Sequence, residues 1–177
     1  MYIVIKINTM SSKKIFPLIL LCIIMAFTVI AQRFEVPADY SFDSKEGYHK
    51  YDNDIIKCVN WMEKTPPKES NNKVKKAGDF LAEWLTGCPY VHFAQNVRID
   101  AFLANSPELR IYYMGGWARY ALQNPIKTSK VECCMAGIRC AIKVYKDNKF
   151  LDRDPNVDEV AGIDAQGKLQ EWVADRM

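Results

Sequence analysis

Apolar side chains recur every three or four residues along most of this 177-residue chain, a spacing that is typical of one helical face. The first such helix begins after Ser44 and runs to about Lys64, where a Thr-Pro-Pro run ends it. The second begins within residues 70–72 and ends at Gly87, because Pro89 prevents its continuation. The predicted buried faces are Tyr48, Tyr51, Ile55, Val59 and Met62 in the first helix, and Val74, Ala77, Leu81, Trp84 and Leu85 in the second.

The stretch of residues 106–124 differs from these helices, because residues 111–118 carry no charge at all. Ser106 and Pro107 predict an N-cap and a first-turn proline, and Glu108 stands where the helix dipole favours a negative charge. A helix that is apolar around most of its circumference belongs inside a protein. We therefore expect this helix at the centre of the fold.

A partner for the central helix follows at once in the sequence. Ser129 and Glu132 form a possible capping box for a helix that runs to about Lys146. Both helices carry small residues: Gly115, Gly116 and Ala118 in the first, and Ala136, Gly137, Cys140, Ala141 and Val144 in the second. We expect these two faces to meet and to give a tight helical hairpin over residues 106–146.

The remaining segments complete an all-α prediction. Residues 90–104 suit both an alternating strand and a helical turn, and we expect an extended piece followed by a short helix. Asp154 and Pro155 begin a further helix, and Leu169, Trp172 and Val173 lie on a last short one. The sequence thus predicts one globular all-α domain of five to seven helices around the hairpin.

The first residues have the pattern of a cleaved signal peptide. Lys13 and Lys14 precede an apolar run over residues 15–30, and small residues predict cleavage between Ala31 and Gln32. The run is short for a spanning helix, although an uncleaved anchor and a lipoprotein centred on Cys22 are alternatives. Residues 10–14 are themselves a normal signal-peptide opening, so we expect translation to begin at Met10.

Removal of the leader changes the charge of the protein. Taking 31 residues from 177 leaves 146, enough for one domain with a single core. The leader contains three lysines and no acid, so of 24 basic and 21 acidic side chains the mature chain keeps 21 of each. A neutral domain offers no electrostatic case for nucleic acid or an anionic membrane as partner, and we expect no membrane insertion after cleavage.

The pattern Pro-Glu-Leu, Tyr-Met-Gly-Gly-Trp and Tyr-Ala-Leu over residues 107–122 resembles one in small exported proteins of Bacteroidetes. The leader ending in Ala31 and Gln32 is similar to theirs, and the resemblance extends through residues 136–145. It implies export across the inner membrane of a Gram-negative cell, to the periplasm or the cell envelope. It implies no particular activity.

Five cysteines remain after cleavage, and an exported protein sits in an oxidising compartment that favours disulfides. Cys58 and Cys88 lie on neighbouring predicted helices and are the best candidate pair. Cys133 and Cys140 are seven residues apart on one helix, about 10 Å and beyond disulfide reach. The alternative is that all five cysteines are small buried hydrophobic residues.

No arrangement in the sequence predicts a catalytic residue, a cofactor or a metal. The chain lacks a Gly-x-Ser-x-Gly elbow, a phosphate-binding glycine loop and a Cys-x-x-Cys motif. Cys88 and His92 have a ligand-like spacing, but Pro89 prevents a regular helix between them. Residues 152–158 resemble the start of a calcium loop, yet Val157 occupies the position that requires glycine.

The best candidates for a binding surface lie on the central helix. They are Arg110, Tyr113, Trp117 and Arg119, although aromatic residues there are more often core and arginines more often snorkel to the surface. Because catalytic arrangements are missing, we expect a non-catalytic exported domain that binds a protein, a peptide or an envelope component. The alternatives are a hydrolase-like envelope enzyme with a site built from scattered residues, and a thiol- or metal-dependent sensor.

Overall fold

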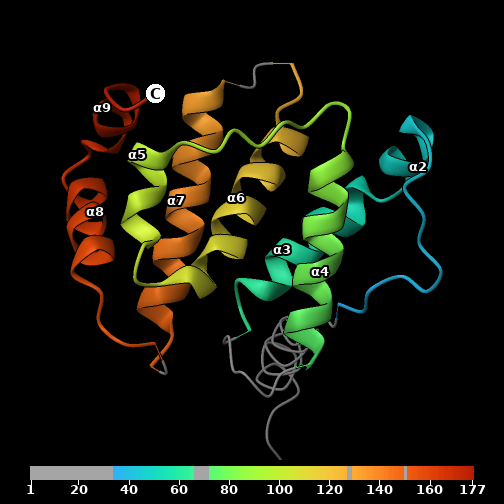
Figure 1. Cartoon of the computed structure of the whole chain (residues 1–177), viewed down its shortest axis with the longest axis horizontal. Coiled ribbons are helices and arrows are strands. Elements are labelled where there is room, and N and C mark those ends of the chain that lie inside the picture. The colour runs from blue at the N-terminus through green and yellow to red at the C-terminus, as the bar shows by residue number, and fades with distance from the viewer. Residues whose placement is uncertain (1–33, 66–71, 127–128, 150) are drawn as a thin grey trace, which may run out of the picture. The chain divides into compact units, whose positions relative to one another are not determined.

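A computed structural model describes residues 34–65, 72–126, 129–149 and 151–177 (Figure 1). The described part is helical and contains no strand, which confirms the all-α prediction. The signal peptide of residues 1–31, the start at Met10, the cleavage site, the proline pair and Ser70 lie outside the described residues. Residues 34–177 form one compact unit.

Eight α-helices are present among the described residues, more than the five to seven expected. They are α2 (Lys45–Lys50), α3 (Asp52–Met62), α4 (Asn72–Gly87), α5 (Val97–Asp100), α6 (Arg110–Gln123), α7 (Lys130–Asp147), α8 (Pro155–Ala165) and α9 (Leu169–Ala174). Two short 3-10 turns, η1 (Ala101–Leu103) and η2 (Pro107–Leu109), precede α6.

The predicted helix over residues 44–64 is divided in two at Tyr51. Ser44 caps α2 as expected, because its hydroxyl accepts a hydrogen bond from the Gly47 amide. Tyr51, however, has ψ near 3° and leaves the helical geometry. Its ring makes edge contacts with the rings of Phe42 and Phe80. The apolar periodicity continues through the break, so the sequence pattern did not reveal it.

The ambiguous segment after α4 behaves as predicted. Residues 91–96 have no regular structure, and α5 and η1 follow them directly. Asn96 caps α5 by accepting a hydrogen bond from the Arg98 amide. Its side-chain amide donates to the main-chain carbonyl of Arg176, so this connection also holds the end of the chain.

Helices α6 and α7 pack against each other through Gly116 and Gly137, as the sequence predicts (Figure 1). Gly115 was expected on the same face but faces Val59 of α3 and Leu81 of α4 instead. A Cβ atom placed on Gly116 would lie 2.6 Å from the Cβ of Cys140 and 2.7 Å from the carbonyl oxygen of Ala136. A Cβ on Gly137 would lie 2.5 Å from the carbonyl oxygen of Tyr113. Glycine at both positions is therefore what permits this backbone separation.

The start of α6 differs from the prediction in one detail. Ser106 makes no cap bond; its hydroxyl instead donates to Asp154, 2.6 Å away in the buried interior. Asp154 also caps α8, because its other carboxylate oxygen accepts from the Asn156 amide. The Asp154 amide donates to the hydroxyl of Tyr145. This buried group of polar contacts joins the start of η2 and α6 to α7 and α8.

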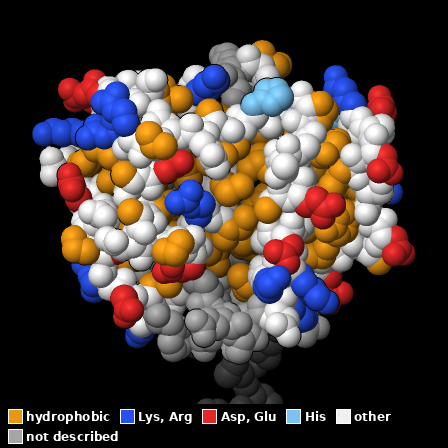
Figure 2. Space-filling view, viewed as in Figure 1, with side chains coloured by type: hydrophobic (Ala, Val, Ile, Leu, Met, Phe, Trp, Pro, Cys, Tyr) orange, Lys and Arg blue, Asp and Glu red, His pale blue; other side chains and the backbone are white. Residues whose placement is uncertain are grey.

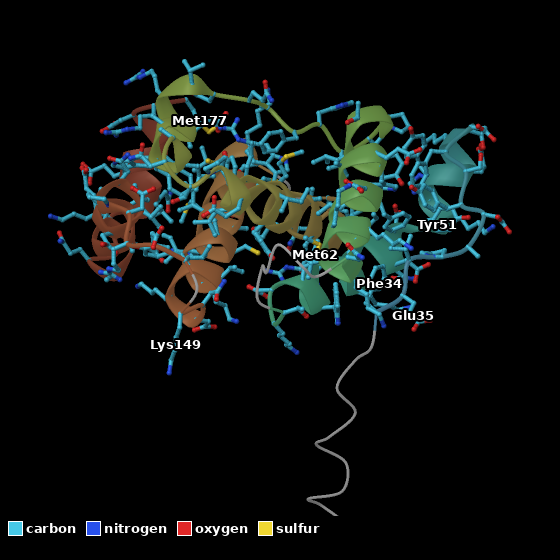
Figure 3. All side chains as sticks on the ribbon, turned by 60° about the horizontal axis from the view of Figure 1, so that its bottom comes forward. Phe34, Glu35, Tyr51, Met62, Lys149 and Met177 are labelled. Carbon is cyan, nitrogen blue, oxygen red and sulfur yellow. The ribbon has the colours of Figure 1, made fainter. Side chains whose placement is uncertain are left out.

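Buried side chains from every long helix form one hydrophobic core. They fill the space between the ribbons, as Figure 3 shows with the side chains drawn. Hydrophobic side chains also reach the surface between α4 and α5 on the face shown in Figure 2. None of the described helices combines the length and the apolar character that a membrane span requires.

Candidate functional site

The two aromatic residues predicted to bind a ligand belong to the core. Tyr113 is 1% exposed and Trp117 is 2% exposed. Both rings make edge contacts with Phe93, and Tyr113 contacts Phe102 in the same way. Neither side chain is available to a ligand, because α6 is covered by other elements on both of these sides.

The two arginines of the same prediction have separate surroundings. Arg110 is exposed at the start of α6, and its charge lowers the pKa of Asp100, although burial raises that pKa overall. Arg119 is half-buried and reaches Glu63 at the end of α3. Of the four predicted binding residues, only Arg119 lines the groove described below.

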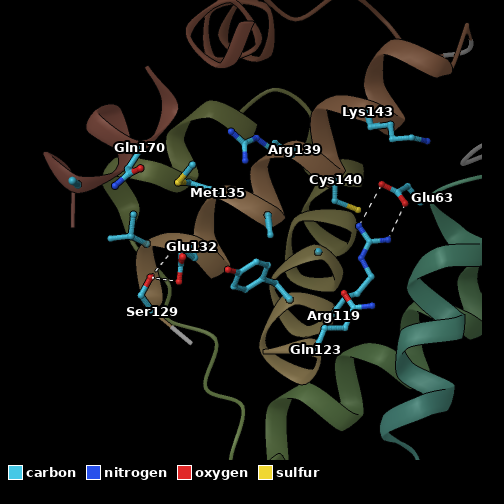
Figure 4. A pocket seen from close by; sticks show the side chains of 15 residues that line it. Glu63, Arg119, Gln123, Ser129, Glu132, Met135, Arg139, Cys140, Lys143 and Gln170 are labelled. Atoms are coloured by element: carbon cyan, nitrogen blue, oxygen red, sulfur yellow. Dashed lines mark hydrogen bonds and ion pairs between the residues drawn. The ribbon is translucent and has the colours of Figure 1, made fainter. Parts of the chain in front are cut away.

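A groove with a volume of about 880 Å³ runs along the outer face of α6 and α7 (Figure 4). This size is typical of a ligand-binding cleft. We call it the α6–α7 groove. Glu63 lies at one end of it, and Gln170 and Ala174 of α9 lie at its side. The other lining residues are Gly116, Arg119, Tyr120, Gln123, Ser129, Val131, Glu132, Met135, Ala136, Arg139, Cys140 and Lys143.

The floor of the groove is a consequence of the tight hairpin. Gly116 and Ala136 are too small to fill the space above the helix contact, and Cys140 is almost fully buried beneath it. Val131 and Met135 are partly buried apolar residues that pack against the core. The middle of the groove is therefore lined by small and apolar residues, and polar and charged side chains surround them.

An ion pair closes the groove beside α3. Arg119 Nη1 donates to Glu63 at 2.8 Å and to the side-chain oxygen of Asn60 at 2.8 Å, and the two charged side chains are only 19% and 14% exposed. Burial disfavours the Arg119 charge, but the hydrogen bonds to Glu63 outweigh it and the pKa of Arg119 is raised. Arg119 therefore forms one side of the groove, and the Glu63 carboxylate neutralises its charge.

Two further cations lie one turn apart on α7. Arg139 uses only its Nε to contact Asp164, at 2.9 Å, and its side chain is 52% exposed. Lys143 forms a long 3.3 Å contact with the exposed Asp147. Exposed pairs of this kind contribute little, so both cations can exchange their partners for a ligand.

The other end of the groove is acidic. Glu132 accepts a hydrogen bond from the hydroxyl of Ser129 at 2.9 Å, and Ser129 in turn accepts one from the Glu132 amide at 3.1 Å. This confirms Ser129 as the cap of α7. Desolvation and the neighbouring Glu132 carboxylate raise the pKa of Tyr120, whose hydroxyl points to the same place.

A second cluster of polar groups joins α2, α3 and the segment after α4. His49 Nδ1 lies 2.9 Å from one carboxylate oxygen of Asp52, and the hydroxyl of Tyr90 donates to the other at 2.5 Å. The imidazole stacks on the Tyr90 ring with centroids 4.0 Å apart. A carboxylate that holds Nδ1 leaves Nε2 for acid–base chemistry. This pair was not predicted from the sequence, although the three-residue spacing of His49 and Asp52 on one predicted helix is a signal that could have found it.

The cysteine beside this cluster is not activated. Desolvation raises the pKa of Cys88, against the opposing effect of the Tyr90 and Val91 amides. A protonated thiol is a weak nucleophile. The raised pKa of Cys88 therefore gives no support to a cysteine-hydrolase role for this cluster.

The predicted disulfide between Cys58 and Cys88 is not formed in this structure, where both residues are free thiols. Cys58 donates instead to the Ala77 carbonyl and contacts the sulfur of Met62. All five cysteines of the described part are buried, and desolvation raises the pKa of each. This matches the alternative in which they are small core residues, and it gives no support to a thiol-dependent sensor.

Among the described residues, no group of three or more histidine, cysteine or acidic side chains is placed to hold a metal ion.

The groove residues Glu132, Arg139 and Lys143 were missed as site residues, because charges on one helix face look like ordinary solvated positions in a sequence. Comparison with known proteins adds no assignment: no protein-family model matches the chain, and no match was found among the curated proteins or the solved structures.

Proposed function

We propose that this chain is an exported, non-catalytic helical domain that binds a peptide segment in the α6–α7 groove. The leader would carry the domain to the periplasm or the cell envelope. The peptide would lie along α7, between the acidic end at Glu132 and the basic end at Arg139 and Lys143.

The observation that carries this proposal is the shape and lining of the groove. It is a long, open space over a floor of small residues, with half-buried apolar side chains in its middle and charges at its ends. A bound peptide segment would bury apolar side chains in the middle of the groove and pair its charged ends with the charged residues of the rim. Arg119 is neutralised by Glu63, so no unpaired half-buried charge opposes occupation of the centre.

The test is a calorimetric titration of the purified protein with four blocked pentapeptides. Each has an Ala-Leu-Ala centre, and the ends are Lys and Glu, Glu and Glu, Lys and Lys, or Gln and Gln. We expect at least one to bind with a Kd of about 100 μM or tighter, and to be recovered chemically unchanged.

The variant Ala136→Trp places an indole on the groove floor and should weaken that binding by about tenfold or more. Its matched control is Ala165→Trp, at the exposed end of α8 outside the groove. Circular dichroism melting of both variants reports whether the fold is kept. Binding of no peptide by the wild-type protein, or equal loss in both folded variants, contradicts the proposal.

A further inference from the structure

We infer that the α6–α7 groove selects a short peptide with a basic group at one end and an acidic group at the other. This inference rests on the proposed peptide-binding function and names the class of ligand. It follows from the order of charges along α7, from the partners that these charges have, and from the distance between them.

The acidic end presents a carboxylate without a neutralising cation. Within the described residues, Glu132 is bonded to the hydroxyl of Ser129 and lies beside the hydroxyl of Tyr120. Hydroxyl groups orient a carboxylate but leave its charge in place. Glu132 is exposed on the first turn of α7, so a ligand's ammonium or guanidinium group can reach it from the groove.

The basic end presents cations whose donors are only partly used. Arg139 contacts Asp164 through Nε, which leaves the two terminal nitrogens of its guanidinium for a carboxylate. Lys143 lies one turn further along the same face, and its contact with Asp147 is long and exposed. Arg119 adds no free charge here, because the Glu63 carboxylate, 2.8 Å from Nη1, neutralises it.

The separation of the two ends sets the length of the ligand. Glu132 precedes Arg139 by seven residues and Lys143 by eleven, which corresponds to about 10 Å and about 16 Å along an α-helix. An extended peptide advances by about 3.3 Å per residue. These distances correspond to about three to five steps along an extended chain, so charged groups at the two ends of a segment of about four to six residues meet both ends of the groove at once.

The middle of the groove explains why the ligand should be uncharged there. Ala136 and Met135 lie between the two charged ends and offer apolar contact. A charge placed over them would lose water without gaining a partner. The three zones together describe a ligand that is dipolar, short and apolar at its centre.

The same four pentapeptides test this inference with the wild-type protein and two charge-reversal variants. We expect the Lys–Glu peptide to bind about tenfold more tightly than the Glu–Glu and Lys–Lys peptides. Glu132→Lys should shift the preference to the Glu–Glu peptide, and Arg139→Glu should shift it to the Lys–Lys peptide. Lys146→Glu, on the same helix but outside the groove lining, should leave the order unchanged.

The outcomes separate the inference from the proposed function. Equal affinity for the Lys–Glu and Gln–Gln peptides, lost on Ala136→Trp, keeps peptide binding and overturns the dipolar selection. If the wild-type protein prefers the Lys–Glu peptide but both reversals leave that preference unchanged, the dipolar selection is also overturned. Charges other than those of Glu132 and Arg139 would then select the peptide. Absence of binding to all four peptides overturns both. Melting curves identify any reversal variant that does not fold, and Glu132→Gln and Arg139→Gln then replace it, each expected to remove the preference at its own end.

Discussion

The contact of α6 with α7 and the aromatic cluster beside α4 are two opposite ways to build a core. The helix contact depends on missing side chains: Gly116 and Gly137 bring two backbones into direct contact. The aromatic cluster depends on large side chains, with rings of Phe34, Tyr40, Phe42 and Tyr51 all within 6.3 Å of Phe80, centroid to centroid.

The difference shows where the packing can adjust to a substitution. Side chains in the aromatic cluster meet at varied angles, from stacked to edge-on, and several members are only partly buried. Such a cluster can relax when one ring is changed. A backbone that touches another backbone has no rotamer to change, so we expect the smallest addition there to be more harmful than a larger deletion in the cluster.

The largest effect should come from Gly137→Ala. The added methyl would lie 2.5 Å from the Tyr113 carbonyl oxygen, so the two helices must separate. We expect a loss of about 3 kcal/mol in the free energy of unfolding, measured by urea denaturation. The groove floor should widen as well, which would be seen as weaker peptide binding.

Gly162→Ala in α8 is the matched control. Nothing lies within 4 Å of a Cβ placed there, and the residue is inside a helix. We expect a gain of about 0.5 kcal/mol from the better helix propensity of alanine. If both substitutions had similar effects, the close contact of α6 and α7 would not be the reason that position 137 requires glycine.

A smaller effect should follow Phe80→Leu. Phe80 is fully buried and contacts four other rings, yet leucine keeps much of its volume and its neighbours can move inward. We expect a loss of about 1.5 kcal/mol in the free energy of unfolding, again from urea denaturation. A loss greater than that of Gly137→Ala would reverse the comparison between the two regions.

The smallest effect concerns pH and the thiols of the hairpin. Burial raises the pKa of Cys140 from 9.0 to about 12. The unfolded chain therefore releases this proton as pH rises above 9, whereas the folded protein keeps it until about pH 12. The contribution of the protonated Cys140 thiol to the free energy of unfolding is therefore fully present below pH 9 and is lost between pH 9 and pH 12.

Cys140→Ala removes this contribution. Between pH 8 and pH 10 the variant should lose about 1 kcal/mol less than the wild-type protein in the free energy of unfolding. Urea denaturation at the two pH values gives the difference, with Lys75→Ala, in an exposed pair on α4, as a control that should follow the wild-type slope. Parallel losses in wild type and Cys140→Ala would show that Cys140 ionises equally in both states.

Much of the fold could be predicted from local signals. Ser44, Ser129 and Asp154 cap helices where the sequence placed them, since capping depends on groups within one turn. The contact of Gly116 with the small face of α7 was also predictable, because small residues at helical spacing permit little else. The break at Tyr51 was not, since the apolar pattern is continuous across it.

The candidate site was largely beyond the sequence. Tyr113 and Trp117 were named as binding candidates although aromatic residues there are more often core. Because α6 is apolar around most of its circumference, periodicity could not tell which side meets solvent. Arg119 was correctly placed near a surface, but its partner Glu63 is 56 residues away in the chain. The packing of α3 and α9 against the hairpin decides which charged side chains line the groove. No local sequence pattern predicts that packing.

The hairpin also has a kinetic consequence. Helices α6 and α7 make the most extensive helix contact among the described elements, and they are neighbours in the chain, so joining them closes only a short loop. Contacts between nearby segments form quickly, whereas the pairing of α3 with α6 must wait for a longer closure. We therefore expect the helix pair that Gly116 and Gly137 bring together to form early, before the rest of the chain packs on it.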